Sequence, residues 1–346
     1  MEPIHTALTS YGMSGLVFHG PLLQAHPGFT IHSVLERHRN DSRNRHPDAL
    51  LVRHLDDILN DPRVELVVVN TPDHLHFEMA SAALKSGKHV VVEKPLTQTV
   101  KQADELIGLA KENGVMLSVF QNRRWDGDFL TVRKIIEEGK LGRLVSFESH
   151  FDRFRNYIQD SWKESDALNS GTLYNLGSHM IDQALVLFGM PDAVFADVRG
   201  MRTGSLVDDT FDVVLHYPDV KCMVRGSYLV KEEGPRYILH GTHGSFLKWG
   251  IDPQEEALKR GEVPGGSDWG REASVNWGTL VTEASGQEER MRIETAAGNY
   301  TAYYDNIHAV IRNGAELAVK ATEARNVIKV IAAAYESSRD QKVIRL

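Results

Sequence analysis

Short, nearly continuous apolar runs recur through the first third of this chain, and this pattern constrains the fold more than any other feature. They are expected as strands at residues 4–10, 30–36, 65–71, 89–94 and 116–121. The last three runs contain too few polar residues for a strand with one face in water, so both faces of their sheet must be covered. Amphipathic helical patterns separate the runs, at 54–60, 75–86 and 100–112. Alternating strands and helices predict an α/β fold with a doubly wound parallel sheet.

The pattern changes after residue 122. Helices are expected at 128–138 and 172–188, a strand at 143–154, and successive strands from 193 to 250. Runs of strands without intervening helices predict a large open, mostly antiparallel sheet in an α+β domain. We expect two domains, 1–121 and 122–346, with a cleft between them. Residues 252–277 are expected as a surface excursion, and helices at 300–313 and 322–339 close the chain.

Composition excludes several classes of function. The 346 residues include 39 Lys and Arg against 47 Asp and Glu, and the net charge of −8 argues against a nucleic-acid partner. No run approaches the ~20 apolar residues of a membrane span, and the first 20 residues lack a signal-peptide pattern. Cys222, the single cysteine, cannot form an internal disulfide. A soluble cytoplasmic protein is expected.

The segment Ser-Tyr-Gly-Met-Ser-Gly at 10–15 fits the dinucleotide fingerprint G-x-G-x-x-G, with serine at the first glycine position. It follows an expected strand and opens a helix, as a Rossmann domain requires, because the helix N-terminus receives the pyrophosphate. The alternative is a glycine-rich turn without a ligand. The residues expected to contact a dinucleotide here are Ser10, Gly12, Met13, Ser14 and Gly15.

Glu36 ends the next strand, 21 residues after Gly15. A carboxylate at this place can accept hydrogen bonds from the adenosine ribose, which would favour NAD. The residues that follow are strongly basic: Arg37, His38, Arg39, Arg43, Arg45 and His46. They lie where the 2′-phosphate of NADP would lie, although such a run can also be a solvated loop. NADP is the expected cofactor, with NAD as the alternative.

Glu93-Lys94-Pro95 ends a buried strand. The carboxyl ends of parallel strands face the ligand crevice, so Lys94 is expected to point at the substrate. An ammonium group there would stabilise the alkoxide that precedes hydride transfer. Pro95 would fix the backbone, and a cis peptide bond is one way of doing so. The alternative is a surface lysine with a packed stem.

Asn175, His179 and Asp182 are spaced to share one helix face. Histidine suits proton exchange with a hydroxyl group, and a neighbouring carboxylate fixes its tautomer and raises its basicity. A satisfied structural histidine is the alternative. A metal site built from His74, His76, His179 and Asp182 would lack a recognisable ligand spacing, so no metal is expected.

With these motifs assembled, the chain resembles the Gfo/Idh/MocA oxidoreductase family, named for glucose-fructose oxidoreductase and inositol dehydrogenase. Six blocks carry the resemblance, at 10–23, 67–97, 121–131, 148–155, 174–189 and 236–258. The last four are similar to the subgroup that contains NADP-dependent scyllo-inositol dehydrogenases. The resemblance implies that Lys94 is the catalytic lysine and His179 the proton-transfer histidine. The family's aspartate falls on Asn175, which cannot supply negative charge, and Asp182 is a candidate to compensate.

The resemblance also implies contacts that the motifs alone do not. The residues on the nicotinamide side would be Thr71, Pro72, His76, Glu93 and Gln121. Those along the substrate would be Arg124, Trp125, Trp162, Lys163 and Tyr174, with Trp162 also counted among the cofactor contacts. In the family the sheet of the second domain commonly forms an interface, which implies a homodimer or homotetramer.

Taken together, these features predict an NAD(P)-dependent oxidoreductase that acts on a secondary alcohol of a sugar, cyclitol or related polyol. Two other classes remain open. One is a glycoside-cleaving enzyme that oxidises its substrate transiently with a bound cofactor. The other is a dinucleotide-sensing module without catalysis, for which Asn175 is the sequence hint.

Overall fold

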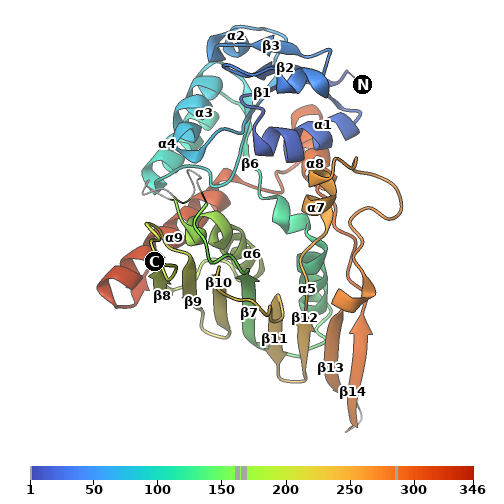
Figure 1. Cartoon of the computed structure of the whole chain (residues 1–346), viewed down its shortest axis with the longest axis vertical. Helices are drawn as coiled ribbons and strands as arrows, with labels where there is room; N and C mark the ends of the chain where they lie inside the picture. Colours follow the sequence, from blue (N-terminus) through green and yellow to red (C-terminus); the bar gives the residue numbers. More distant parts are fainter. Residues whose placement is uncertain (1, 160–163, 165–169, 285–286) are drawn as a thin grey trace. The chain divides into compact units, whose positions relative to one another are not determined.

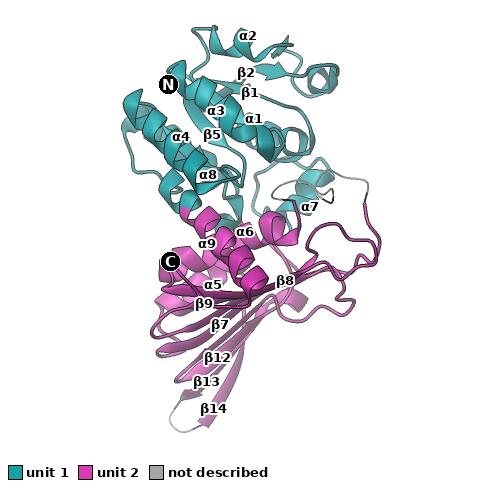
Figure 2. Cartoon of the chain, turned by 90° about the vertical axis from the view of Figure 1, so that its left-hand side faces the viewer, with its two compact units in different colours: residues 1–125, 253–269, 299–325 teal, residues 126–252, 270–298, 326–346 magenta. Residues whose placement is uncertain are grey.

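The computed structural model describes residues 2–159, 164, 170–284 and 287–346. These residues form two compact units, shown in separate colours in Figure 2. Unit 1 comprises residues 1–125, 253–269 and 299–325, and unit 2 comprises 126–252, 270–298 and 326–346. The sequence predicts a single division after residue 121. The compact units divide after residue 125 instead, and two later segments return to unit 1.

The described part of unit 1 is built on a six-stranded parallel sheet in the order β3-β2-β1-β4-β5-β6. Figure 1 labels β1, β2, β3 and β6 of this sheet. Its strands are β1 (Ile4–Leu8), β2 (Phe29–Leu35), β3 (Leu50–Val52), β4 (Leu66–Val69), β5 (His89–Val92) and β6 (Leu117–Val119). In the centre Leu8 aligns with Val68 and Val68 with Val91, and all three are fully buried. The doubly wound α/β class is confirmed. β3 was not expected, because three residues at a sheet edge leave no periodic signal.

Helices and helical turns connect these strands. They are η1 (Gly15–His19), α1 (Gly20–Ala25), η2 (Asp41–Asn44), α2 (Leu55–Leu59), η3 (Asp73–Leu75), α3 (His76–Lys85), α4 (Val100–Glu112), η4 (Asn122–Trp125), α7 (Gln254–Lys259) and α8 (Thr301–Asn313). α7 lies within the expected surface excursion. α8 joins unit 1 through aromatic contacts: the Tyr303 ring lies 5.0 Å from that of Phe120, and the Tyr304 ring 5.4 Å from that of Phe29. These contacts explain why residues 299–325 belong to unit 1.

The described part of unit 2 contains a nine-stranded sheet in the order β14-β13-β12-β11-β7-β10-β9-β8-β15. Its strands are β7 (Leu144–Asp152), β8 (Ala193–Arg199), β9 (Thr210–His216), β10 (Lys221–Ser227), β11 (Tyr237–Gly241), β12 (Gly244–Lys248), β13 (Gly278–Ala284), β14 (Gln287–Ile293) and β15 (Ile344–Arg345). β7 and β10 pair in parallel and the other neighbours are antiparallel. The expected mostly antiparallel sheet is confirmed.

One face of this sheet packs against helices. They are α5 (Gly127–Glu137), α6 (Ser178–Phe188), which follows η6 (Leu173–Gly177), and α9 (Ala321–Asp340), which continues from unit 1 into unit 2. A short η7 (Ser274–Asn276) precedes β13. Phe211, Val213 and Leu215 alternate along β9 into the core, as a strand with one covered face requires. Within the described residues, no helix combines the length and the apolar character needed to span a membrane.

Candidate active site

The turn between β1 and η1 leaves space beside its backbone. Among the described residues other than its chain neighbours, a Cβ atom added at Gly12 would have only the Ser10 hydroxyl within 4 Å, at 3.9 Å. A Cβ atom at Gly15 would lie 2.6 Å from the Ser10 carbonyl oxygen and 3.0 Å from the Asn70 amide nitrogen. Gly15 therefore lets the helix pack on the strand, while Gly12 and the 54%-exposed Met13 remain accessible. This difference between the two glycines fits the approach of a pyrophosphate.

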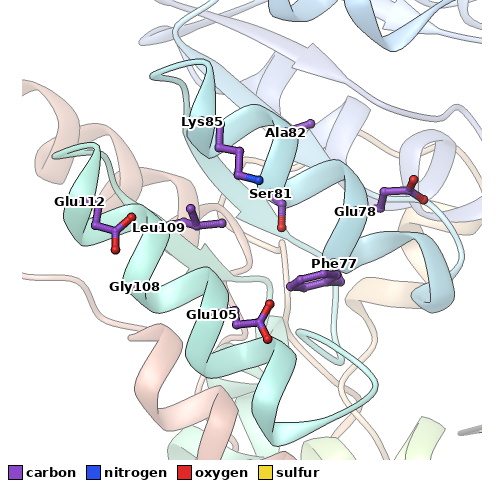
Figure 3. A pocket seen from close by; sticks show the side chains of 9 residues that line it. All are labelled: Phe77, Glu78, Ser81, Ala82, Lys85, Glu105, Gly108, Leu109 and Glu112. Carbon is purple, nitrogen blue, oxygen red and sulfur yellow. The ribbon is translucent and has the colours of Figure 1, made fainter.

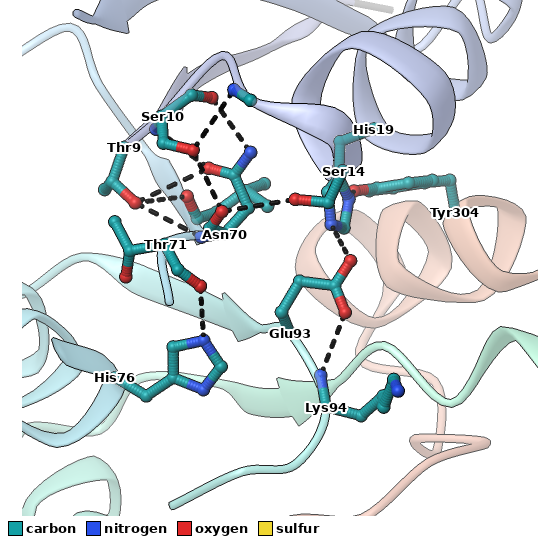
Figure 4. A network of polar contacts seen from close by, with 12 residues as sticks. Thr9, Ser10, Ser14, His19, Asn70, Thr71, His76, Glu93, Lys94 and Tyr304 are labelled. Atoms are coloured by element: carbon teal, nitrogen blue, oxygen red, sulfur yellow. Dashed lines mark hydrogen bonds and ion pairs between the residues drawn. The ribbon is translucent and has the colours of Figure 1, made fainter. Parts of the chain in front are cut away.

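Asn70 directly follows β4 and fastens this turn to it (Figure 4). Its side-chain oxygen accepts a hydrogen bond from the Ser10 amide at 3.0 Å, and its Nδ2 donates to the Ser10 carbonyl at 2.9 Å. The Ser10 and Ser14 hydroxyls both donate to the Asn70 carbonyl, at 3.0 and 3.2 Å. Asn70 was not among the expected site residues, although a polar residue at the carboxyl end of a buried parallel strand was a usable signal.

Two polar atoms at the same edge of the sheet have no hydrogen-bond partner within the described residues. The Thr71 hydroxyl lies just beyond β4 and the Gln121 side-chain oxygen just beyond β6, and both atoms are buried. A buried acceptor without a partner costs roughly 1–3 kcal/mol, so such atoms are expected to meet an ordered water or a bound group. Together with the open Gly12, they fit the polar groups of a nicotinamide dinucleotide. Pro72, half-buried, precedes η3 beside them.

A chain of hydrogen bonds runs from the Lys94 backbone into the interior of unit 1 (Figure 4). Glu93 Oε2 accepts from the Lys94 amide at 3.0 Å, and Glu93 Oε1 lies 3.1 Å from His19 Nε2. The other ring nitrogen of His19 lies 2.6 Å from the Tyr304 hydroxyl. Burial holds the pKa of the Tyr304 phenol well above its ordinary value, so the phenol donates to Nδ1 and Nε2 donates to the carboxylate.

The Glu93 carboxylate is ionised in this setting. Burial raises its pKa, but the hydrogen bond from His19 and the nearby charge of Lys94 act against burial, and the pKa lies below its ordinary value. Lys94 is half-buried and joined to Pro95 by a cis peptide bond. His19 and Tyr304 could not be expected here, because 285 positions separate them along the chain.

His76 lies between two main-chain carbonyl groups. Its Nδ1 is 2.8 Å from the Pro95 oxygen and its Nε2 is 2.9 Å from the Thr71 oxygen. Burial lowers the pKa of His76, although both carbonyl contacts act to raise it. A neutral imidazole has a single N–H and donates to one of these oxygens at a time. His76 therefore connects the segment after β4 to the segment after β5.

Glu36 is buried at the end of β2, and its carboxylate faces its own loop. Its Oε1 accepts from the Asp41 amide at 3.0 Å, and its Oε2 accepts from the Ser42 amide at 3.0 Å and the Ser42 hydroxyl at 2.5 Å. From the sequence this carboxylate was a candidate acceptor for a ribose, and its hydrogen bonds to Asp41 and Ser42 were not among the expectations. Arg37, the next residue, is exposed, as are other basic residues of the loop: His38, Arg39, Arg43 and Arg45.

In unit 2, the helix that carries Asn175, His179 and Asp182 begins with a π-helical segment, Leu173–Gly177. The expected regular helix over 172–188 therefore changes its winding just before His179. His179 and Asp182 lie three residues apart in α6, share a helix face, and are 6% and 2% exposed. Asn175 is half-buried within the π-helical segment. Single π-helical turns inside α-helices are frequent at functional sites.

Asp208 anchors the start of this helix. Its Oδ2 accepts from the Leu173 amide at 2.7 Å, and its Oδ1 accepts from the Tyr335 hydroxyl at 2.7 Å. Its backbone oxygen also accepts from the Thr172 amide at 2.9 Å. Gly171 has φ +103°, which residues with a side chain rarely adopt. A Cβ atom there would also lie 2.2 Å from Asp208 Oδ1, so both the backbone conformation and the available space require glycine. Burial raises the pKa of Asp208 despite these hydrogen bonds.

The expected substrate residues of unit 1 are held by contacts within that unit. The Arg124 guanidinium donates to the Ala318 carbonyl at 2.8 Å and pairs with Glu323 at 2.9 Å. The Trp125 ring meets the Tyr303 ring edge-on, with 5.8 Å between centroids. Arg124 and Trp125 therefore attach η4 to the segments around α8 and the start of α9.

The remaining expected contacts fall in unit 2. Tyr174 is 3% exposed and belongs to the hydrophobic core of that unit. Trp162 and Lys163 lie outside the described residues. Lys94 belongs to unit 1 and His179 to unit 2, so the two halves of the expected site come from different units.

A surface pocket of about 610 Å³ lies between α3 and α4 (Figure 3). Its lining includes Phe77, Leu109 and three carboxylates, Glu78, Glu105 and Glu112. None of the expected site residues lines it, and its carboxylates would repel a dinucleotide. This pocket is therefore distinct from the glycine turn.

Family models match nearly the whole chain. Residues 4–121 match the Gfo/Idh/MocA description "Oxidoreductase family, NAD-binding Rossmann fold", and residues 133–346 match "Oxidoreductase family, C-terminal alpha/beta domain". The first match contains the glycine turn and Lys94, and the second contains His179.

Several relatives match from end to end. The chain is 42% identical to scyllo-inositol 2-dehydrogenase (NADP(+)) IolW of Bacillus subtilis, over 100% of this chain and 97% of that protein. It is 40% identical to the uncharacterized oxidoreductase YdgJ of Escherichia coli, over 100% and 99%. Among solved structures, the yvaA protein of Bacillus subtilis superposes with a TM-score of 0.98 at 42% identity, over 100% of this chain and 99% of that one.

Proposed function

The chain belongs to the Gfo/Idh/MocA family of oxidoreductases, and on this basis we propose that it transfers hydride between a nicotinamide dinucleotide and a secondary alcohol of a cyclitol, sugar or related polyol. One observation carries the proposal. Four features follow neighbouring parallel strands at their carboxyl ends: the open Gly12, Lys94, and the oxygens of Thr71 and Gln121, which have no partner among the described residues. The substrate class rests on the relative named a scyllo-inositol 2-dehydrogenase.

In the proposed reaction, each residue has a separate role. When bound, the nicotinamide ring accepts or donates the hydride. The Lys94 ammonium stabilises the negative charge that develops on the alcohol oxygen. His179 exchanges the hydroxyl proton, and Asp182, on the same helix face, orients its ring. Asn175 can hydrogen bond to a neighbour but supplies no negative charge, so the basicity of His179 depends on Asp182.

We propose NADP as the preferred cofactor, with NAD as the alternative. The Glu36 carboxylate already accepts from three donors of the loop that follows it, so it has less capacity to accept from a ribose. Exposed basic residues follow it, beginning with Arg37. Arginine is suited to bidentate recognition of a phosphate. The full-length relative IolW is named as NADP(+)-dependent, which supports the same choice.

A polyol panel tests the activity directly. The purified protein is incubated with inositol isomers, sugars and sugar alcohols, each with NAD+ and with NADP+, and the absorbance of the reduced cofactor is followed. Turnover on a cyclitol or sugar with NADP+ is the expected result. Cofactor that co-purifies and does not exchange, with cleavage of a glycoside, would support the glycoside-cleaving alternative. Tight binding without turnover on any substrate would support a sensor.

Two variants test the roles of the proposed residues. Lys94→Ala and His179→Ala should each lose most of the turnover, on the order of 10²-fold or more, because each removes a group that acts on the transition state. Both variants should still bind NADP+ in calorimetry. Near-wild-type rates in either variant would contradict the assignment.

We propose a homodimer or homotetramer that uses the open face of the unit 2 sheet. A row of aligned residues crosses this face from β8 to β12, namely Phe195, Val214, Met223, Glu148, Ile238 and Leu247. Five of the six are apolar and none is buried within the described chain. A row of mostly apolar, partly exposed residues of this kind, interrupted by Glu148, fits a second copy of the same face. Light scattering should give at least twice the mass of the chain, and Met223→Lys should lower it.

We also propose a cytoplasmic location. Cys222, the single cysteine, is buried as a free thiol, which suits a reducing compartment. Fractionation of the source cells tests this, and recovery outside the cytoplasm would contradict it.

A further inference from the structure

The Glu36 carboxylate has little capacity left for a ligand. An ionised carboxylate offers about four acceptor positions, and three of them are used by the Asp41 amide, the Ser42 amide and the Ser42 hydroxyl. Accepting both hydroxyls of an adenosine ribose needs two positions. The side chain that spacing alone assigns to ribose recognition is therefore committed to its own loop.

Arg53, just after β3, holds the same loop from the other side. Its guanidinium donates to the Glu36 carbonyl at 2.5 Å, to the Arg39 carbonyl at 2.7 Å and to the Asn40 side-chain oxygen at 2.6 Å. The loop after β2 is thus fastened by a carboxylate from one end and by a guanidinium from a neighbouring strand. Its exposed arginines, such as Arg37 and Arg43, project from a backbone with fixed hydrogen bonds.

The far end of this loop packs on the glycine turn. The rings of His46 and Tyr11 meet edge-on, with 5.5 Å between centroids. Burial raises the pKa of the Tyr11 phenol to about 12, while the nearby charge of Arg45 acts in the opposite direction. The Tyr11 hydroxyl is buried and has no hydrogen-bond partner within the described residues. The basic loop therefore lies beside the turn that fits a pyrophosphate.

We propose that Glu36 is a positioning residue for NADP recognition: it folds the 37–46 loop so that the loop's arginines bind the 2′-phosphate, and it does not bind the ribose. This inference rests on the proposed NADP preference and names the residue that establishes it. It also explains how an acidic residue at the end of β2 is compatible with a phosphate ligand. Its charge is shielded by three donors, and cations lie on the outer side of the loop.

The two roles of Glu36 predict opposite changes in cofactor preference. If Glu36 accepts from the ribose, its replacement weakens NAD+ binding and leaves NADP+ binding unchanged or tighter. If Glu36 positions the loop, its replacement weakens NADP+ binding and leaves NAD+ binding nearly unchanged. Glu36→Gln distinguishes them, because the amide keeps the size of the side chain but places an NH2 group against backbone N–H donors. A purely structural loss would weaken both dinucleotides alike.

Calorimetric titration measures the dissociation constants of NADP+, NAD+ and 2′,5′-ADP, and it requires no substrate. For Glu36→Gln we expect the NADP+ and 2′,5′-ADP constants to rise about tenfold, which is about 1.4 kcal/mol, and the NAD+ constant to change less than twofold. Ser42→Ala keeps the carboxylate and removes one of its donors, so it should change the constants in the same direction by a smaller factor. It serves as the second test if Glu36→Gln folds poorly.

Glu65→Gln is the matched control, since it removes the same charge from another carboxylate of unit 1, which pairs with Arg312 at 2.7 Å. It should leave the ratio of the two dinucleotide constants unchanged. The inference is overturned if Glu36→Gln weakens NAD+ selectively, weakens both dinucleotides equally, or leaves NADP+ unaffected. A wild-type protein that binds neither dinucleotide would instead contradict the proposed function.

Discussion

Replacing each of the two glycines of the β1–η1 turn by alanine should separate folding from cofactor binding. Apart from its chain neighbours, no described residue comes closer than 3.9 Å to a Cβ atom added at Gly12, and Gly12 does not have positive φ. Alanine there should leave the free energy of unfolding unchanged or raise it by about 0.4–1 kcal/mol, because it restricts the unfolded chain. At Gly15 the added atom would lie 2.6 Å from a backbone oxygen, and neither partner can move freely. Overpacking of this kind costs about 1–3 kcal/mol.

The effect on binding should not follow the effect on stability. The methyl group of Gly12→Ala occupies the space through which a pyrophosphate approaches the backbone, so the NADP+ dissociation constant should rise at least tenfold, or about 1.4 kcal/mol. Gly15→Ala should also weaken binding, because the helix must move away from the strand before its N-terminus can receive the anion.

Urea unfolding and calorimetric titration of the two variants provide the measurements. The expected pattern is a stable Gly12→Ala that binds poorly and a destabilised Gly15→Ala. Equal losses of stability in both variants would refute the assignment of open space to Gly12. Unchanged NADP+ affinity in Gly12→Ala would refute the location of the dinucleotide at this turn.

Three further predictions concern buried polar groups. Tyr304→Phe should lower the free energy of unfolding by about 1–3 kcal/mol, because it leaves His19 Nδ1 without the hydroxyl donor 2.6 Å away. Tyr303→Phe is the comparison in the same urea assay and should lower it by about 1 kcal/mol, because the Ser118 hydroxyl 3.0 Å from Tyr303 keeps its bond to another oxygen. Equal losses in the two variants would contradict the chain of hydrogen bonds behind Lys94. Burial raises the pKa of Asp208, so the folded protein holds this proton more tightly than the unfolded chain. The wild type should therefore lose free energy of unfolding relative to Asp208→Asn as the pH rises from about 4 through the raised pKa. Urea titrations of both proteins at several pH values measure this difference, and a difference that does not change with pH would contradict the prediction. Cys222 is 1% exposed and burial raises its pKa, so a thiol reagent should label it at neutral pH only after the chain unfolds, and labelling of the native protein would be the contrary result.

The features of the fold that follow from local sequence were predictable. Residues 66–69, within the run 65–71, are all apolar, and so short an apolar run between turn signals is typical of a strand covered on both faces. Once the parallel sheet is expected, the carboxyl end of the strand at 89–94 indicates that Lys94 faces the ligand crevice, whereas Thr71 and Gln121 were named from the family resemblance. Their assignment to catalysis and cofactor binding stays a prediction.

Groups that act through distant contacts could not be found in this way. His19 lies in a helical stretch with no charged neighbour, and nothing local indicates that Tyr304 would return to meet it. The same holds for Asp208, which reaches the Leu173 amide 35 residues earlier in the chain. Each contact depends on how segments pack after the sheet has formed. The Rossmann unit is completed by α8, whose two tyrosines carry no periodic signal for a dinucleotide fold.

Glu36 shows a different limit, because its position along β2 was expected correctly and the partners of its carboxylate were not. Spacing from the glycine turn locates a Cα atom at the end of a strand. It does not indicate which donors will reach the side chain. Here the chain turns back within six residues, and two backbone amides and a hydroxyl donate to the carboxylate. These donors belong to the same chain and are always near the carboxylate, whereas a ribose must bind from solution to compete with them. On the proposal that Glu36 positions its loop, a carboxylate in this place would indicate NAD only when the following loop leaves it free, and a serine six residues later that can donate to it would be a sequence signal for NADP.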